Sequence, residues 1–243
     1  MPKHFFFDLD KTLTRSRSLM EPDHETTFRM LCERYSVVVV TGGELSQIEK
    51  QIPESCRRRY HTLSQSGNHA VLKVGTVLWS EKFTTAQKTA VNEFIRIVHD
   101  ELRFRVKDEN DLIEDRGSQI SYSLIGHHED IEKKEAFDPD AKKRLAILEK
   151  HKDDIEKLSA AGADVRIGGT TTFDFTLKGK HKGFNIERFI ETMGWKKEDC
   201  VYVGDALFPG GNDETVIGVI PTKPVKDYRE TYVYLRDILQ RPG

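Results

Sequence analysis

Three short apolar runs, each followed at once by polar residues or glycine, restrict the fold of this chain more than any other feature. They cover residues 4–10, 36–41 and 201–204 and are rich in aromatic and β-branched side chains. Uninterrupted runs of this kind are typical of parallel strands buried on both faces of a sheet. Strand alternating with helix predicts a Rossmann-like, doubly wound α/β fold. The helical patterns lie at residues 25–34, 43–51, 183–193 and 227–239.

The middle of the chain has a different pattern. Thr84 or Thr85 caps a long amphipathic helix, and Asp138-Pro139 opens another over residues 138–161. Residues 119–125 and 163–176 have the pattern of strands. This part of the chain therefore combines helices and strands in an order that differs from the flanking parts.

We predict an inserted α+β domain at residues 82–180, within a core domain formed by residues 1–81 and 181–243. The charged run at residues 127–134 is interpreted as a loop or a solvated turn.

The amino-acid composition limits the kinds of molecule that we expect this chain to bind. The 38 Lys and Arg residues nearly balance the 40 Asp and Glu residues, so no strong net field attracts nucleic acid or an anionic membrane. Cys32, Cys56 and Cys200 lie far apart, which argues against a disulfide framework or a zinc site. No run approaches the length of a membrane span, and the N-terminus lacks the pattern of a signal peptide. We expect a cytoplasmic protein that binds a small soluble ligand.

The first apolar run ends in two carboxylates, Asp8 and Asp10, separated by one residue. Ligands of open α/β sheets bind at the carboxyl ends of the strands. As far as strand geometry continues, alternate residues lie on one side of the chain, so both carboxylates are expected to face one reacting group. A divalent cation would offset their repulsion and neutralise phosphate oxygens.

Two further signals suit phosphate binding. Thr41-Gly42-Gly43 follows a buried strand and precedes a helix, so the hydroxyl and the backbone N–H groups could bind a phosphate; an ordinary strand-to-helix turn is the alternative. Lys182 directly precedes another helix, where its ammonium could neutralise charge on a transferred phosphoryl group.

A fourth signal follows the last apolar run. Gly204-Asp205 ends the strand, and a glycine-rich loop leads through Gly210-Gly211 to Asn212-Asp213. Oxygen ligands at the end of a strand suit Mg²⁺, which keeps water or phosphate in its remaining positions.

In their order along the chain, these four signals resemble the sequence motifs of the haloacid dehalogenase superfamily. The resemblance implies that Asp8 is the nucleophile, that Asp10 is the general acid and base, and that Thr41 and Lys182 hold the phosphate. Domain 82–180 looks like the second type of cap in that superfamily. The implied Mg²⁺ ligands are Asp8, the backbone carbonyl of Asp10 and Asp205, with Asn212 and Asp213 close by in the same loop.

Within the superfamily the chain is similar to the eukaryotic type of phosphomannomutase, through the segments 204–213 and 168–174. By that similarity Arg17 and Arg116 would hold the phosphate that does not react, and Thr172 and Asp174 would bind sugar hydroxyls. At two further anion-holding positions stand His127 and Lys134, which lack the planar fork of arginine. Lys11 replaces the glycine of the family's first motif.

These departures favour a phosphatase that acts on a sugar phosphate or a similar phosphomonoester, because a phosphatase needs only one phosphate site. A phosphomannomutase that interconverts hexose 1- and 6-phosphates is the alternative. A non-catalytic binding module on the same scaffold is a third interpretation. Against it stands the presence of the catalytic residues Asp8, Asp10, Thr41, Lys182 and Asp205. The resemblance also leaves a homodimer open.

Overall fold

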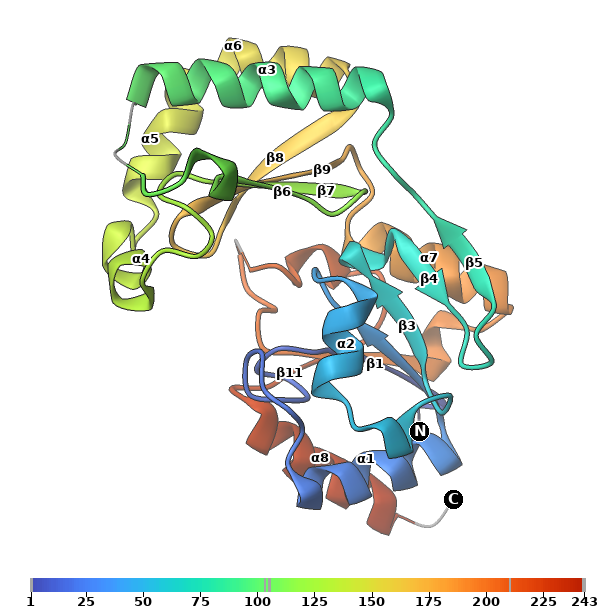
Figure 1. The fold of residues 1–243 in the computed structure, drawn as a ribbon. Coiled ribbons are helices and arrows are strands. Elements are labelled where there is room, and N and C mark those ends of the chain that lie inside the picture. The colour runs from blue at the N-terminus through green and yellow to red at the C-terminus, as the bar shows by residue number, and fades with distance from the viewer. Residues whose placement is uncertain (1, 103, 105, 210, 242–243) are drawn as a thin grey trace. The chain divides into compact units, whose positions relative to one another are not determined.

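The computed structural model describes residues 2–102, 104, 106–209 and 211–241, so Gly210 of the glycine-rich loop lies outside the described residues. The chain divides into two compact units. One is formed by Met1–Ser80 and Lys180–Gly243, and the other by Glu81–Gly179. In Figure 1 the first unit is blue, cyan and orange to red, and the inserted unit is green to yellow. We call them the core unit and the inserted unit.

The core unit is built on a seven-stranded sheet with the order β11-β10-β1-β2-β3-β4-β5. The first five strands in this order run parallel, and β4 and β5 are antiparallel additions at one edge. The strands are β1 (His4–Asp8), β2 (Ser36–Val40), β3 (His61–Ser64), β4 (His69–Val71), β5 (Val77–Ser80), β10 (Cys200–Gly204) and β11 (Thr222–Pro224).

Helices cover both faces of this sheet because its central strands are apolar on both sides. Phe5 and Phe7 of β1 pack with α1, α2 and α8 on one face, whereas Phe6 packs with α7 on the other. The predicted doubly wound α/β fold is therefore confirmed (Figure 1). The helices are α1 (Pro22–Arg34), α2 (Leu45–Gln51), α7 (Lys182–Met193) and α8 (Tyr228–Gln240), with 3₁₀ helices at Glu54–Cys56, Gln65–Gly67, Lys197–Asp199 and Glu214–Val216.

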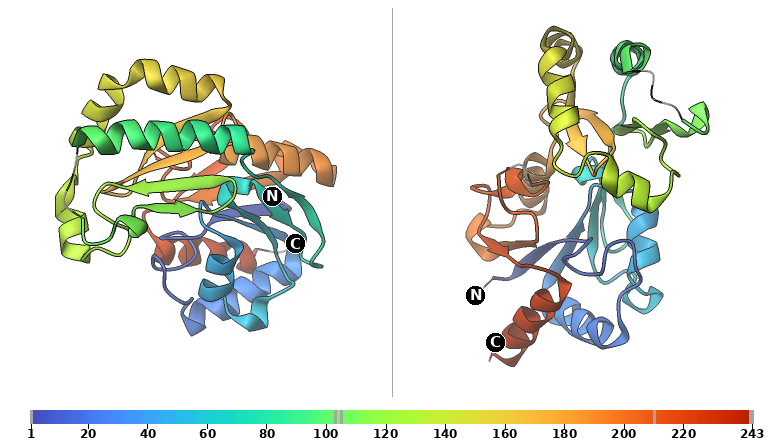
Figure 2. Two further views of the ribbon diagram at one scale, coloured as in Figure 1. Left: turned by 45° about the horizontal axis from the view of Figure 1, so that its top comes forward. Right: turned by 90° about the vertical axis from the view of Figure 1, so that its left-hand side faces the viewer.

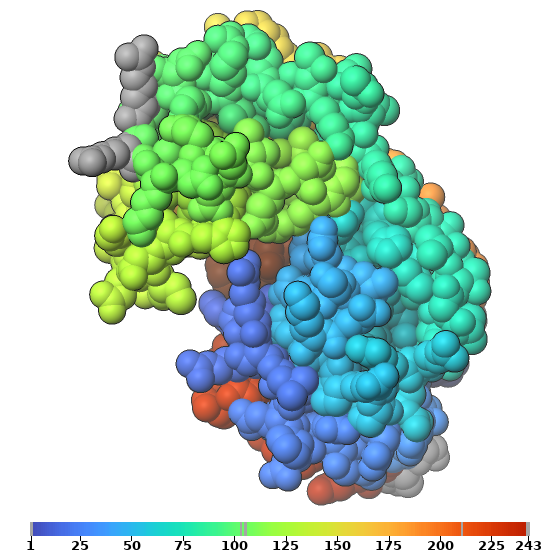
Figure 3. Space-filling view, viewed as in Figure 1, coloured from blue at the N-terminus to red at the C-terminus, as the bar shows by residue number. Residues whose placement is uncertain are grey.

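The inserted unit has a four-stranded antiparallel sheet with the order β6-β7-β9-β8. Figure 2 shows from two further sides that α3 and α6 lie across one face of it. The outer side of α3 is open to solvent (Figure 3), and its buried residues, Val91, Phe94, Ile95 and Val98, belong to the same hydrophobic cluster as the sheet. The elements are α3 (Thr85–Leu102), β6 (Ile113–Asp115), β7 (Gln119–Ser123), α4 (Ile131–Phe137), α5 (Lys142–Lys150), α6 (Lys152–Ala160), β8 (Ala163–Gly168) and β9 (Thr172–Leu177), with a 3₁₀ helix at Glu109–Asp111.

Several local predictions were wrong. The single helix expected over residues 138–161 is two helices that meet at His151. Asp138 does not begin that helix; its carboxylate accepts the backbone N–H groups of Lys143 and Arg144 at 3.1 Å, so it caps a helix that starts later. The end of the charged run at residues 127–134 is helical and not a loop. It forms the start of α4, which begins at Ile131 and is capped by the side chain of Asp130. The strand β1 ends at Asp8 and does not continue to Asp10.

Candidate active site

The site forms where three neighbouring parallel strands end. β1 lies between β10 and β2, with Phe7 opposite Val203 and Asp8 opposite Val40. Asp8 is therefore the last residue of the central strand, Thr41 follows β2 directly, and Asp205 follows β10 directly. Three of the sequence signals thus meet at the carboxyl edge of the sheet, as the parallel fold requires.

Lys182 lies between two of the carboxylates. Its Nζ donates to Oδ1 of Asp8 at 2.6 Å and to Oδ1 of Asp213 at 2.7 Å, and all three side chains are buried. Lys182 is the first residue of α7, and the next residue, Gly183, leaves no room for a side chain: an added Cβ would lie 1.9 Å from the carbonyl oxygen of Thr215. The start of α7 is therefore packed directly against the loop that carries Asp213.

Tyr202 belongs to the same group, although the sequence did not reveal it. Its hydroxyl donates to Oδ1 of Asp213 at 2.6 Å and is fully buried, and the backbone N–H of Ala206 donates to Oδ2 of Asp213 at 3.4 Å. Asp213 thus accepts hydrogen bonds from Lys182 and Tyr202 through Oδ1 and from the backbone of its own loop through Oδ2. The available signal was a hydroxyl in an otherwise apolar strand, two residues before Gly204.

Negative charge exceeds positive charge among these buried groups. Burial raises the pKa of Asp8; the ammonium of Lys182 opposes this shift, and the carboxylates of Asp213 and Asp205 add to it. Burial also raises the pKa of Asp205, and Asp213 contributes in the same direction. Burial disfavours the ammonium of Lys182, but the carboxylates of Asp213 and Asp8 outweigh this and raise its pKa. One ammonium is shared among several carboxylates.

A divalent cation fits this arrangement. Asp8, Asp205 and Asp213 each offer a carboxylate oxygen, and these oxygens lie within 4.8 Å of one another. Oxygen ligands and a shortage of positive charge both suit a hard cation. Thr12 fixes Asp205, since its hydroxyl donates to Oδ1 at 3.2 Å and accepts the Asp205 backbone N–H at 3.1 Å. The side chain of Asn212, in the same loop as Asp213, is exposed.

Asp10 takes part in a separate network, contrary to the expectation that it shares one side of a strand with Asp8. Its carboxylate accepts hydrogen bonds from Gln47 and Gln51 of α2 and from the backbone N–H of Arg17. The strand ends at Asp8 and the chain bends at Leu9, so strand periodicity does not extend to Asp10. Arg17 contacts Asp10 through its backbone, and its side chain is exposed.

Thr41 and Gly42 lie at the same edge of the sheet. The backbone N–H of Thr41 donates to the carbonyl of Leu63 at 3.0 Å, and the Thr41 hydroxyl oxygen accepts the N–H of Gly43 at 3.1 Å. Gly42 is half-buried, and among the described residues other than its chain neighbours an added Cβ would approach the hydroxyl of Ser66, at 3.9 Å. The backbone beside Gly42 is thus open to a small group.

In the inserted unit, the predicted anion-binding residues lie together around one carboxylate. Arg116 donates to Oε2 of Glu114, through Nε at 3.1 Å and also through Nη2. Nδ1 of His127 lies 3.7 Å from Oε1 of the same residue, and Lys134 donates to the backbone carbonyl of His127 at 2.7 Å. Arg116 and His127, two of these three predicted anion-binding residues, therefore already face the carboxylate of Glu114. The sequence did not single out Glu114.

The predicted sugar-binding residues, Thr172 and Asp174, lie on β9, which pairs with β7. Oδ1 of Asp174 accepts the hydroxyl of Ser121 at 2.6 Å, and the Ser121 carbonyl lies 3.1 Å from Nε2 of His127. The hydroxyl of Thr172 donates to the carbonyl of Gly168 at 2.8 Å. Asp174 and His127 are thus linked through Ser121, a residue that the sequence did not identify.

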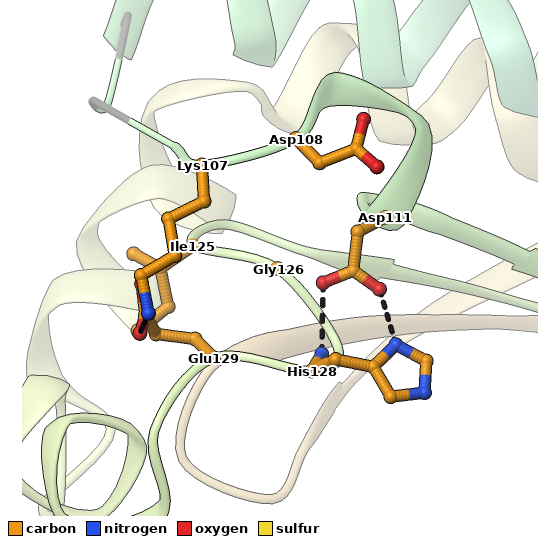
Figure 4. A pocket seen from close by; sticks show the side chains of 7 residues that line it. All are labelled: Lys107, Asp108, Asp111, Ile125, Gly126, His128 and Glu129. Atoms are coloured by element: carbon orange, nitrogen blue, oxygen red, sulfur yellow. Dashed lines mark hydrogen bonds and ion pairs between the residues drawn. The ribbon is translucent and has the colours of Figure 1, made fainter.

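A polar pocket elsewhere in the inserted unit contains none of the predicted site residues. Figure 4 shows its lining, in which Asp111 accepts hydrogen bonds from the backbone and the ring of His128. Lys107 pairs with Glu129 at 2.5 Å. Lys107 and His128 thus each pair with a carboxylate of this pocket.

Residues 2–208 match the family of haloacid dehalogenase-like hydrolases, and the chain belongs to this family. It is an enzyme of the phosphohydrolase or phosphomutase kind that acts on small phosphorylated substrates. Among characterised relatives it is similar to phosphomannomutase 1 of Dictyostelium discoideum, with 27% identity over 215 residues, 85% of this chain and 83% of the relative. It is also similar to the phosphomannomutase of Triticum aestivum, with 25% identity over 86% of this chain and 84% of the relative.

Solved structures support the fold. The IMP-nucleotidase of Plasmodium falciparum, truncated at its N-terminus and bound to IMP, matches with a TM-score of 0.70 and 14% identity, over 99% of this chain and 68% of its own. A haloacid dehalogenase-like hydrolase of Bacteroides thetaiotaomicron matches with a TM-score of 0.67 and 13% identity, over 98% and 100%. At these identities the likeness concerns the fold alone. Within the part of the chain described above, no helix is long and apolar enough to cross a membrane.

Proposed function

We propose that this enzyme is a magnesium-dependent phosphatase that hydrolyses a sugar phosphate, or a similar phosphomonoester, through an aspartyl-phosphate on Asp8. The observation that carries the proposal is the buried group at the edge of the sheet, in which the Lys182 ammonium lies 2.6 Å from Oδ1 of Asp8 among the carboxylates of Asp205 and Asp213. Such a group can deliver a carboxylate nucleophile to a phosphate while balancing its charge.

In the first half of the reaction, a carboxylate oxygen of Asp8 attacks phosphorus. A new P–O bond forms to Asp8, and the P–O bond to the leaving alcohol breaks in line with it. Asp10 gives its proton to the leaving oxygen. The hydroxyl of Thr41 and the backbone N–H of Gly42 would bind the phosphoryl oxygens, and Lys182 would balance their charge.

In the second half, Asp10 takes a proton from water, which attacks the phosphorus of the aspartyl-phosphate. The bond between phosphorus and the Asp8 oxygen breaks, so phosphate leaves and both aspartates return to their starting states. Mg²⁺ would be held by Asp8 and Asp205, with Asp213 fixing the lysine beside them; when bound, it neutralises the phosphate and orients it toward the nucleophile. The backbone carbonyl of Asp10 and the side chain of Asn212 are further proposed ligands.

Phosphomannomutase activity is the second candidate, favoured by the identity of 25 to 27% to enzymes of that name. In the phosphatase, Arg116, His127, Lys134, Thr172 and Asp174 would bind the rest of the substrate; in the mutase, the cationic ones would hold a second phosphate, together with Arg17. A homodimer and a cytoplasmic location stay predictions.

The test is phosphate release from a panel of hexose phosphates and other phosphomonoesters with Mg²⁺, beside conversion of mannose 1-phosphate to the 6-phosphate with a bisphosphate activator. Rapid release from one ester, abolished by a chelator and restored by Mg²⁺, is the expected result. Isomer formation with little release would instead establish the mutase. Activity in neither assay would refute both and favour the binding module.

A further inference from the structure

The carboxylate of Asp10 is surrounded by hydrogen-bond donors from α2 and from its own loop. Nε2 of Gln47 donates to Oδ2 at 2.6 Å, and Nε2 of Gln51 donates to Oδ1 at 3.3 Å. The backbone N–H of Arg17 donates to Oδ1 at 2.7 Å. Both oxygens of Asp10 are therefore fixed in space by three hydrogen-bond donors.

Gln47 reaches Asp10 only because residue 43 is glycine. A Cβ added to Gly43 would lie 1.8 Å from Oε1 and 2.8 Å from Cδ of Gln47. Gly43 does not have a positive φ, so its backbone conformation is open to any residue. The need for glycine here comes from space: the Gln47 amide occupies the place where a side chain of residue 43 would lie.

The side-chain amides of Gln47 and Gln51 differ in how firmly hydrogen bonds fix their orientation. The amide of Gln51 is buried and fixed, because its Oε1 accepts the hydroxyl of Thr14 at 2.6 Å while its Nε2 points to Asp10. The side chain of Gln47 is half-buried, and its Oε1 accepts no hydrogen bond from the described residues. The Gln47 amide can therefore turn about its last bond without losing another partner.

This freedom matters for a residue that both gives and takes a proton. An ammonium or guanidinium group only donates hydrogen bonds, whereas an amide both donates and accepts. The Gln47 amide can therefore hydrogen-bond to the Asp10 carboxyl group through either Nε2 or Oε1.

We propose that Gln47, in the space left by Gly43, is a positioning residue for proton transfer by Asp10, with Gln51 as the fixed second support. Gln47 holds the Asp10 carboxyl group in one place through the hydrogen bond from its Nε2 to Oδ2, at 2.6 Å. This inference rests on the proposed function, in which Asp10 protonates the leaving oxygen.

The test compares two phosphate esters of similar size whose leaving groups differ. Benzyl phosphate releases a strongly basic alkoxide, which needs the proton of the general acid, whereas p-nitrophenyl phosphate releases a stabilised phenolate, which does not. The measured quantity is kcat/KM, because it reports the steps up to formation of the aspartyl-phosphate, before water enters. For Gln47→Ala we expect kcat/KM to fall about 10- to 100-fold with benzyl phosphate, with little change for p-nitrophenyl phosphate.

Gly43→Ala is the second variant, since its methyl group would displace the Gln47 amide without touching Asp10. It should show the same selective loss, and the double variant Gly43→Ala/Gln47→Ala should be no worse than Gln47→Ala alone. Lys50→Ala, on the exposed side of α2, is the matched control and should leave both substrates unchanged.

The inference would be overturned if Gln47→Ala lowered kcat/KM equally for the two esters. It would also be overturned if the effects of Gly43→Ala and Gln47→Ala on kcat/KM added in the double variant. Either result would leave the phosphatase in place. A wild-type enzyme that hydrolyses neither these esters nor any member of the substrate panel would instead overturn the proposed function, and the inference with it.

Discussion

The core unit contains a histidine that should make it sensitive to acid. His61 begins β3 and is buried, and its Nδ1 accepts the backbone N–H of Lys73 at 3.3 Å. The ring lies 5.5 Å from that of Phe189 and 6.0 Å from that of Trp195, both edge-on. Burial lowers the pKa of His61 from 6.5 to about 4, and the charges of Lys73 and His4 add to the shift.

The direction of the effect follows from the two states of the ring. In the unfolded chain His61 takes up a proton as the pH falls through 6.5, whereas in the folded chain it stays neutral until about pH 4. Acid therefore favours the unfolded state over this interval, and the stability present at neutral pH is lost. Between about pH 7.5 and about pH 5 the loss due to His61 alone is about 2 kcal/mol in the free energy of unfolding.

The assay is urea unfolding at these two pH values, followed by tryptophan fluorescence. Both tryptophans, Trp79 and Trp195, lie in the core unit, so the signal reports the unit that contains His61. His61→Asn keeps an acceptor for the Lys73 N–H but has no proton to gain. We expect the fall in unfolding free energy between the two pH values to be about 2 kcal/mol smaller in this variant than in the wild type.

His24, whose pKa burial also lowers, is present in both proteins and cancels in the comparison. His128→Asn is the control: the wild-type side chain is exposed and belongs to the inserted unit, so its removal should leave the acid-induced loss reported by the tryptophans unchanged. The reasoning is refuted if His61→Asn loses as much stability in acid as the wild type.

Three further substitutions test the site and the two units. Asp8→Asn should lower turnover by at least about 10³-fold with an unchanged circular dichroism spectrum, and substantial remaining phosphate release would contradict a nucleophilic role. Arg144→Met leaves the buried Asp138 carboxylate without the guanidinium 2.8 Å away, so thermal unfolding should show a loss of about 3 kcal/mol; a loss near zero would mean that other groups already stabilise this charge. Gly183→Ala forces α7 away from the Thr215 carbonyl and should cost about 1 to 3 kcal/mol in urea unfolding, together with activity, whereas wild-type values would show that the loop yields freely.

The fold could be predicted where side-chain patterns extend over whole elements. β1, β2 and β10 have apolar side chains at their central positions because both faces of the sheet are covered, and this pattern is visible without a structure. The hairpin of β4 and β5 was missed because it lies at the sheet edge, where Val77 is 53% exposed and no such pattern is required. The break at His151 was missed because the apolar positions on its two sides fit one continuous helix.

The candidate site could be predicted only in part, for a related reason. Asp8, Lys182 and Asp205 occur in short motifs at the end of a strand or the start of a helix. The residues beside each of them in the sequence mark that position, so these three could be identified without a structure. Tyr202 and Gln47 act across the fold, on Asp213 and Asp10, and nothing in their local sequence distinguishes a buried hydroxyl or an amide with a role from one without. Such residues become visible only when the contacts between elements are known.

The charges of the inserted unit bear on the choice between phosphatase and mutase. A mutase must hold a second phosphate, which calls for cations that the protein itself does not neutralise. Arg116 and His127 already face the carboxylate of Glu114, and the Lys134 ammonium is bound to a backbone carbonyl. A second phosphate would have to compete with Glu114 for both partners, and neither His127 nor Lys134 offers the bidentate geometry of arginine. A neutral, hydroxyl-rich group does not need these cations, and Ser121 and Asp174, which hydrogen-bond to each other at 2.6 Å, are polar partners for it on the same sheet. This balance favours a substrate with a single phosphate, and therefore the phosphatase.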